Sequence, residues 1–164
     1  MHIHYISEQN SILNHFLAQI RDVNIQKDSM RFRKNIERIG EIMAYELSKT
    51  LDYKEIDVQT PLGIKHTTTI AEPVVLCSIL RAGLALHQGF MSFFDNAENG
   101  FVSAYRHHYD NDDKFEILVE YQAAPSFEGK NLILIDPMLA TGQSLVAVLH
   151  KLHLEHQPKE IHIA

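Results

Sequence analysis

The sequence predicts an α/β protein in which helices flank a parallel β-sheet, with a helical region at the N-terminus and a β-hairpin arm. Three observations predict this class. The chain of 164 residues suffices for one domain with a buried core. Several short runs are continuously apolar, as strands covered on both faces are, and helical patterns alternate with these runs. We expect a single domain over 1–164, with N-terminal helices in 1–50, the arm in 51–72 and the parallel core in 73–164.

The first fifty residues carry apolar side chains at a spacing of three to four. This spacing is typical of amphipathic helices, and it predicts one helix over 7–20 and a second over 29–50. Within 53–70 the period changes to two around the turn residues "PLG", which predicts the hairpin arm. Such an arm either packs on another subunit or forms the edge of its own protein, and the sequence leaves both possibilities open.

After Pro73 the sequence alternates between strand and helix patterns. The apolar runs that predict strands are "VVLCSIL", "FVSAY", "FEILVEY", "LILI" and "EIHIA", and helices are predicted over 82–94 and 142–154. The polar stretch "RHHYDNDDK" at 106–114 predicts a loop. Because a chain seldom ends inside an apolar strand, the final "EIHIA" indicates that the sequence is a truncated part of a longer protein.

Composition narrows the class of partner and the compartment. Acidic residues exceed basic ones by six and no run of Lys or Arg occurs, so nucleic acid is not an expected partner. The N-terminus lacks the pattern of a signal peptide, and no apolar run reaches membrane-spanning length. The sequence therefore predicts a soluble, cytoplasmic protein that binds no membrane.

Two reactive residue types predict no site of their own. The single cysteine, Cys77, lies inside an apolar run, which predicts a buried thiol in a reducing compartment rather than a nucleophile. His150, His153 and His156 recur on the last predicted helix, but no cysteine or fixed carboxylate completes a metal site. We expect these histidines to be solvated and no metal to be held by side chains alone.

The stretch "LILIDPMLATGQS" is the main candidate for a ligand site. In a doubly wound sheet, ligands bind where strands end and helices begin. Residues 141–144 would place unpaired backbone N–H groups at the N-terminus of a helix, which favours a phosphate. Asp136, at the strand end, can accept hydrogen bonds from a sugar diol, so the loop predicts a ribose phosphate. On these residues alone, a capped helix without a ligand is equally compatible.

Two arginines also follow predicted strands. Arg81 comes directly after "VVLCSIL", and Arg106 comes directly after "FVSAY". Because the carboxyl ends of parallel strands meet at one edge of a sheet, both guanidinium groups could bind an anion near Asp136. Either arginine alone could equally form a surface ion pair, but the three strand ends together favour a common site.

The motifs "ILRAG", "AYR" and "DPMLATGQS", in this order and at these separations, resemble the uracil phosphoribosyltransferase family. The stretch "DSMRFRKNIERIGEIMAYEL" resembles the N-terminal helix of that family. The resemblance implies a type I phosphoribosyltransferase fold and the reaction of uracil with 5-phosphoribosyl 1-diphosphate (PRPP) to give UMP and diphosphate, a step of pyrimidine salvage. It also implies Mg²⁺ bound mainly through PRPP, and a homo-oligomer, either a dimer or a tetramer.

The resemblance implies a role for each residue that matches a motif. Asp136 would hold the ribose hydroxyls, and Arg81 and Arg106 would bind the departing diphosphate, which makes Asp136 and Arg106 the expected catalytic residues. The PRPP-binding residues that it implies are Arg81, Arg106, Asp136, Pro137, Met138, Leu139, Ala140, Thr141, Gly142, Gln143 and Ser144. The segment 106–114 is a candidate cover that keeps water away from PRPP, or else a plain surface loop.

Two departures from the family pattern keep a second reading open. The family's loop reads Thr-Gly-Gly-Ser, whereas Gln143 replaces the second glycine here and would be strained if that position needs a positive φ. The family's Gly-rich uracil-reading segment has no counterpart in this sequence. The readings are therefore a uracil phosphoribosyltransferase without its C-terminal part, or a non-catalytic regulatory module that binds PRPP or a nucleotide. The "DPM" sequence argues against a purine-specific enzyme.

Overall fold

The computed structural model describes residues 2–108, 115–155 and 157–164, and it contains the helices and strands that the sequence predicts, with shifted ends. The N-terminal part consists of α1 (Ile12–Arg21), α2 (Ser29–Ser48) and the hairpin strands β1 (Tyr53–Thr60) and β2 (Gly63–Ile70). The remaining elements are β3 (Val74–Leu80), α3 (Leu84–Met91), β4 (Glu98–His108), β5 (Phe115–Ala123), β6 (Asn131–Ile135), α4 (Gln143–Glu155) and β7 (Glu160–Ile163).

Side-chain caps decide where the first two helices begin. The hydroxyl of Ser11 accepts a hydrogen bond from the Leu13 N–H at 3.2 Å, and the Asn14 side chain accepts one from the Ser11 N–H at 3.0 Å. These reciprocal bonds start α1 after Ser11, later than the predicted start at Ser7. The Asp28 carboxylate accepts bonds from the N–H groups of Met30 and Arg31 at 3.1 and 3.0 Å, which starts α2 at the predicted residue.

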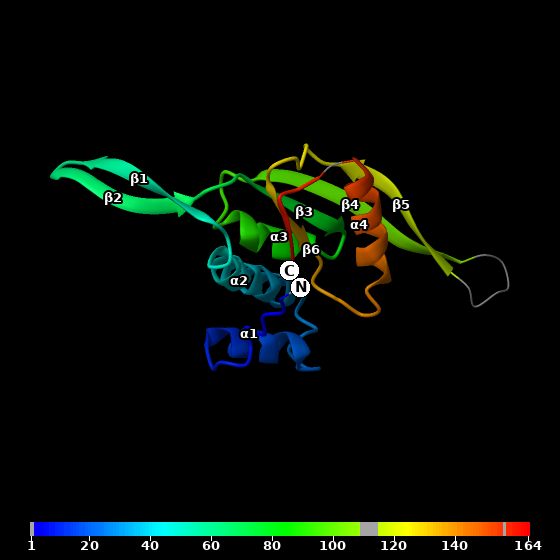
Figure 1. Cartoon of the computed structure of the whole chain (residues 1–164). Helices are drawn as coiled ribbons and strands as arrows, with labels where there is room; N and C mark the ends of the chain where they lie inside the picture. Colours follow the sequence, from blue (N-terminus) through cyan, green and yellow to red (C-terminus); the bar gives the residue numbers. More distant parts are fainter. Residues whose placement is uncertain (1, 109–114, 156) are drawn as a thin grey trace.

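The main sheet has the order β5-β4-β3-β6-β7. The neighbouring pairs β4–β3, β3–β6 and β6–β7 are parallel, but β5 runs antiparallel to β4, so the sheet is mixed and not wholly parallel as predicted. The reason is the length of the connection. A parallel return needs a crossover of about a dozen residues or more, whereas only residues 109–114 separate the end of β4 from the start of β5. Figure 1 shows these two strands leaving the body side by side.

The loop predicted at 106–114 is therefore shorter than the sequence suggested. Residues 106–108 belong to β4, where Arg106 pairs with Ile117 and His108 pairs with Phe115. The rest of that stretch, 109–114, lies outside the residues that the structure describes.

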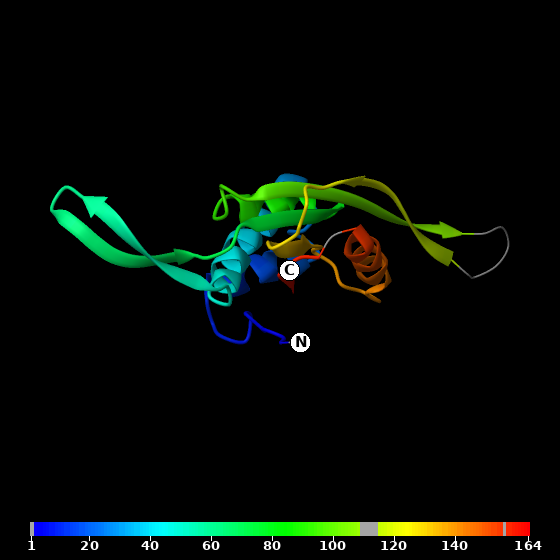
Figure 2. The ribbon, with the colours of Figure 1, turned by 45° about the horizontal axis from the view of Figure 1, so that its top comes forward.

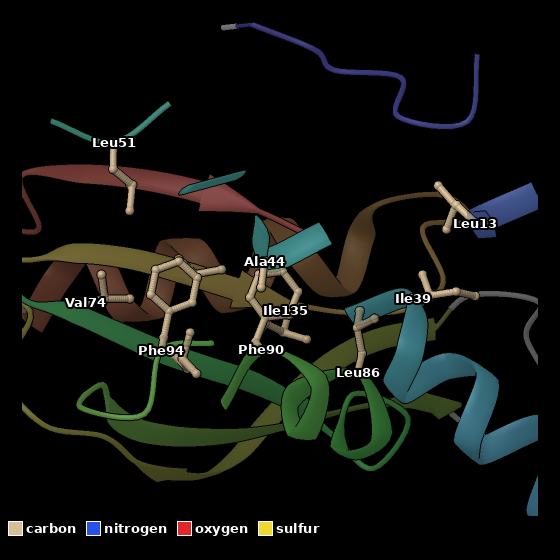
Figure 3. Close-up of a cluster of buried hydrophobic side chains, with 11 residues drawn as sticks. Leu13, Ile39, Ala44, Leu51, Val74, Leu86, Phe90, Phe94 and Ile135 are labelled. Carbon is tan, nitrogen blue, oxygen red and sulfur yellow. The ribbon is translucent and has the colours of Figure 1, made fainter. Parts of the chain in front are cut away.

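Helices cover both faces of the sheet. On one face, α1, α2 and α3 pack on β3 and β6 through a buried cluster drawn in Figure 3. The residues of this cluster are Leu13, Ile39, Ala44, Leu51, Val74, Leu76, Leu86, Phe90, Phe94, Ile133 and Ile135. On the other face, α4 packs through Leu145, Val148 and Leu152 against a second cluster that includes Val75, Cys77 and Val102. The alternation of residues along β3 between the two clusters follows the period of two of a strand.

The helices α2 and α3 cross in backbone contact at two glycines. A Cβ atom on Gly40 would lie 2.4 Å from the Leu86 carbonyl oxygen, and one on Gly89 would lie 2.1 Å from the Glu37 carbonyl oxygen. No larger residue fits at either position without moving a helix, because the obstructing atoms belong to the backbone. This crossing fixes α3 and the turn that precedes it.

The strands β1 and β2 form the predicted hairpin arm, which projects from the body at the end opposite to the β4–β5 ribbon (Figures 1 and 2). Its base is tied to the residue before β7, since the Lys159 ammonium lies 2.9 Å from Asp52 Oδ2 and 2.5 Å from Glu72 Oε1. Along the arm, Leu62 is fully exposed and Ile64 is 64% exposed.

Among the helices of the described residues, none combines the length and the apolar character that a membrane-spanning helix needs.

Candidate active site

The candidate site lies at the end of the sheet that is formed by the carboxyl termini of the parallel strands β3, β4 and β6. In the sheet β3 lies between β4 and β6, and Ser78 of β3 pairs with Phe101 on one side and Ile135 on the other. Arg81 follows β3 directly and Asp136 follows β6 directly. The structure thus brings the turns that carry these two residues to neighbouring positions at the same edge, as predicted.

The turn after β3 folds back tightly onto the sheet. A cis peptide bond joins Leu80 to Arg81, and the Gly83 N–H donates to the Ile79 carbonyl at 3.0 Å. A Cβ atom on Gly83 would lie 2.2 Å from Ser78 Oγ and 3.0 Å from the Ile135 carbonyl oxygen. The Gly83 backbone has a helical φ of −64°, so close packing, and not backbone conformation, requires the glycine. The contact presses the Arg81 turn against the end of β6.

Asp136 is half-buried and held by its own backbone neighbours. Its N–H donates to the Ala164 carbonyl at 2.9 Å, and its Oδ1 accepts from the Met138 N–H at 3.2 Å. The second bond closes a turn directly after the strand, which fixes the carboxylate at the start of the loop.

The loop after Asp136 surrounds a hollow of about 190 Å³. Its lining residues are Asp136, Met138, Leu139, Ala140, Thr141, Gly142, Gln143, Ser144 and Leu145. The Val146 N–H donates to the Gly142 carbonyl at 2.9 Å, so α4 starts at this hollow. The first N–H groups of a helix have no acceptor within the helix, and they carry the positive end of its dipole. The hollow therefore suits a phosphate group.

Gln143 is not strained in this loop. The positive φ, +75°, belongs to Gly142, whereas Gln143 is the first residue of α4 and has a helical backbone. The glycine that the loop conformation requires is thus present, and the exposed Gln143 side chain extends from a position that accepts any helical residue. The departure from the family's loop sequence does not disturb the backbone that would bind the phosphate.

The sequence had suggested that Arg106 follows the end of a strand, but the structure places it within β4. β3 pairs with β4 only as far as Ser103, and from there β4 continues with β5 as its partner. Arg106 therefore lies beyond the end of β3 at the same edge of the sheet, on the two-stranded β4–β5 ribbon. The paired backbones of β4 and β5 therefore position Arg106, which does not lie in a loop.

The sequence analysis did not single out two polar residues that the structure buries, Ser78 and His87. Ser78 is fully buried under the Gly83 turn, and its only sequence signal is a polar residue inside an apolar strand. His87 on α3 is also buried, its Nε2 lies 2.8 Å from Asn99 Oδ1, and burial lowers the pKa of its imidazole. The sequence around His87 gives no comparable signal.

The thiol of Cys77 is buried as predicted, and burial raises its pKa to about 12. Such a thiol is protonated at neutral pH and is no nucleophile. In the described ranges 2–108, 115–155 and 157–164, no three His, Cys, Asp or Glu side chains gather in a way that could hold a metal ion.

The sequence model of the family described as uracil phosphoribosyltransferase matches residues 6–164. The chain belongs to the uracil phosphoribosyltransferase family. A uracil phosphoribosyltransferase of Porphyromonas gingivalis is 48% identical over 164 residues, which are 100% of this chain and 76% of that relative. One of Methanothermobacter thermautotrophicus is 36% identical over 151 residues, 91% of this chain and 68% of that protein.

Solved structures share the fold of this chain. The AQ2163 protein of Aquifex aeolicus is similar with a TM-score of 0.81 at 29% identity, over 94% of this chain and 72% of its own. A hypoxanthine phosphoribosyltransferase of Staphylococcus aureus is similar with a TM-score of 0.57 at 16% identity, over 80% and 62% of the two chains. The second likeness shows the fold alone, and it confirms the predicted phosphoribosyltransferase fold.

Proposed function

We propose that the protein transfers the phosphoribosyl group of PRPP to uracil, which gives UMP and diphosphate and serves pyrimidine salvage. One observation carries the proposal: the hollow between the carboxylate of Asp136 and the N-terminus of α4 offers a diol acceptor and a phosphate site side by side. A ribose 5-phosphate has both groups. Membership of the uracil phosphoribosyltransferase family supports uracil as the acceptor base.

The loop divides the work of binding. Residues 140–144 wrap the 5-phosphate with backbone N–H groups and with the hydroxyls of Thr141 and Ser144. Pro137, Met138 and Leu139 shape the loop between this phosphate site and Asp136. The Asp136 carboxylate accepts hydrogen bonds from the ribose hydroxyls, so the sugar is held at both ends.

The arginines act on the other side of the sugar. When the bond between the anomeric carbon and the diphosphate breaks, positive charge develops on the ribose and negative charge on the departing diphosphate. Arg81 and Arg106 lie at the same edge of the sheet, and their guanidinium groups bind this diphosphate. Fixed cations that meet a developing negative charge lower the barrier without reorganising during the reaction.

Magnesium fits this site as a companion of the substrate. Mg²⁺ prefers oxygen ligands and is usually held by one or two carboxylates together with phosphates and water. The half-buried Asp136 provides one carboxylate, and no acidic cluster of three is present among the described residues. Asp136 would hold the ion together with PRPP, whose diphosphate charge the bound Mg²⁺ partly neutralises.

We further propose that the protein acts as a homo-oligomer in the cytoplasm. The hairpin arm supports an oligomer, because its apolar residues Val58, Leu62 and Ile64 are exposed on a ribbon that extends away from the body. A second copy of the chain is the partner that we expect on this surface, in a dimer or a tetramer. The buried, reduced Cys77 supports a cytoplasmic location.

The experiment is an assay of UMP formation from labelled uracil and PRPP with the purified protein. We expect Asp136→Asn to lower kcat by about 100-fold or more, because the neutral amide replaces a preorganised charge. The matched control is Asp95→Asn, which makes the same change at an exposed loop residue and should leave the rate unaltered. Undiminished turnover in Asp136→Asn would contradict the site assignment. Calorimetric binding of PRPP without turnover of any base would favour the regulatory module.

A further inference from the structure

A β-bulge interrupts the ladder between β4 and β5 close to Arg106. Val102 pairs with Gln122 and Ala104 pairs with Val119. Between these pairs β4 has one residue, Ser103, whereas β5 has two, Glu120 and Tyr121. A bulge bends its strand and strengthens the twist of the ribbon, so it sets the direction in which the ribbon continues. Here the ribbon continues into the segment that carries Arg106.

Two side chains form hydrogen bonds with backbone groups at this bulge. The Tyr121 N–H donates to Ser103 Oγ at 3.0 Å, which ties the extra residue of β5 to β4. The Val119 carbonyl accepts a hydrogen bond from the Lys151 ammonium at 2.8 Å, and this contact is partly buried. Backbone groups at a bulge lose their regular ladder partners, so such side-chain bonds decide how firmly the bulge is held.

Lys151 belongs to the helix that starts at the phosphate hollow. It lies two turns beyond Gln143, about 12 Å along α4 at the rise of an α-helix. The same helix is fixed on the sheet by Leu145, Val148 and Leu152, which are buried beside Val102. On the other side of the bulge, Arg106 is two residues beyond Ala104. The Lys151 contact therefore links the helix that would bind the 5-phosphate to the ribbon that would bind the diphosphate.

We propose that Lys151 is a positioning residue: its ammonium fixes the β4–β5 bulge to α4 and so sets the distance between Arg106 and the phosphate hollow. The inference rests on the proposed function, since it assigns the two ends of PRPP to these two elements. Without this bond the ribbon would still pack on α4 through the side chains of Ala104 and Val119, but it would lose the polar contact that fixes the β5 backbone beside the bulge. The diphosphate site would then vary in geometry, which would weaken the binding of PRPP and slow its reaction.

The kinetic test compares three lysine variants. Lys151→Met keeps the aliphatic stem but removes the donor, and we expect kcat/KM for PRPP to fall about tenfold, the usual scale for one charge-assisted hydrogen bond. The KM for uracil should not change. Lys151→Arg restores a donor at this position and should recover most of the loss. Lys49→Met, the same change at an exposed lysine of the α2 C-terminus, should match the unmodified protein.

A double-mutant cycle separates positioning from general support of the fold. If Lys151 acts through Arg106, Lys151→Met should add less than about a twofold loss in an Arg106→Ala background, because the residue that it positions is already absent. A further tenfold loss in that background would overturn the proposal. So would an arginine variant no better than the methionine variant.

Hydrogen exchange gives a readout that needs no activity. In Lys151→Met the Tyr121 amide should exchange about tenfold faster, while amides of the β1–β2 arm keep their rates. Unchanged exchange at Tyr121 would overturn the proposal. If Lys151→Met does not fold, Ser103→Ala probes the same bulge from β4 and should show the same exchange pattern. An unmodified protein without UMP formation would refute the proposed function instead, and the exchange rates would still decide whether Lys151 holds the bulge.

Discussion

Gly83 offers the sharpest test of how the Arg81 turn is held. In Gly83→Ala the new Cβ would lie 2.2 Å from Ser78 Oγ, 2.8 Å from the Ile79 carbonyl oxygen and 3.0 Å from the Ile135 carbonyl oxygen. The Ser78 hydroxyl can rotate away, but the two carbonyls belong to the backbone. The turn must therefore move away from β6, and it takes Arg81 with it.

The size of the effect follows from two opposing terms. Overpacking a tight site costs about 1–3 kcal/mol of unfolding free energy. Replacing glycine by alanine at a φ of −64° returns about 0.4–1 kcal/mol, because the unfolded chain loses freedom. We expect a net loss of up to about 2.6 kcal/mol, which lowers the melting temperature of a protein of this size by up to about 5–10 °C. The displaced arginine should lower kcat/KM for PRPP more than about tenfold.

The assay combines thermal unfolding with PRPP kinetics, and a second variant checks the cause. Adding Ser78→Ala to Gly83→Ala removes the nearest obstruction and should regain at least about 0.5 kcal/mol relative to independent effects. Gly129→Ala is the control: its φ of +70° makes alanine strained, but nothing lies within 4 Å of the new Cβ. It should cost stability without a loss of activity. Full stability and activity in Gly83→Ala would refute the packing argument.

Three further predictions address groups outside the loop. Burial lowers the pKa of His87 in the folded protein, so below the ordinary value of 6.5 only the unfolded chain gains a proton. The free energy of unfolding should therefore fall by up to about 1.4 kcal/mol for each pH unit below that value. Urea unfolding from pH 7.5 to 5 should show this slope, and His87→Gln should remove it. Cys77, with a pKa of about 12, should react with a thiol reagent at pH 8 only as fast as the protein unfolds; faster labelling would contradict its burial. Ile64→Lys on the exposed arm should lower the oligomer mass in light scattering without altering the circular dichroism of the fold; an unchanged mass would contradict an arm-mediated contact.

The sequence predicts those elements whose signal is local. The helix over 29–50 was predicted from its apolar spacing, and the Asp28 cap explains why α2 begins at Ser29. The strand β6 was predicted from a continuous apolar run. The start of α1 was placed too early, at Ser7, although residues 7–11 are all polar and the Ser11 cap leaves them outside the helix. A periodic pattern shows which face is buried, and a cap shows where the helix begins.

The direction of β5 and the position of Arg106 depend on partners distant in sequence. An apolar run predicts a strand but not its neighbour, and the length of the β4–β5 connection was the one available sign of a hairpin. The residues 106–108 gave no strand signal because they are polar and extend beyond β3, so only pairing with β5 keeps them in a strand. The loop at Asp136 was predictable for the opposite reason: its turn residues, its glycine and the following helix form one continuous stretch.

The central place of β3 in the sheet has a consequence for how the protein is made. Its partner β4 follows closely in the chain, but its other partner, β6, begins only at Asn131. During synthesis the β6-facing edge of Val74 to Ser78 thus remains without a neighbour until residues 131–135 have left the ribosome. An unpaired apolar strand edge is a template for pairing with other chains. Aggregation during expression should therefore depend on how soon β6 reaches β3, and slow translation between the two strands should increase it.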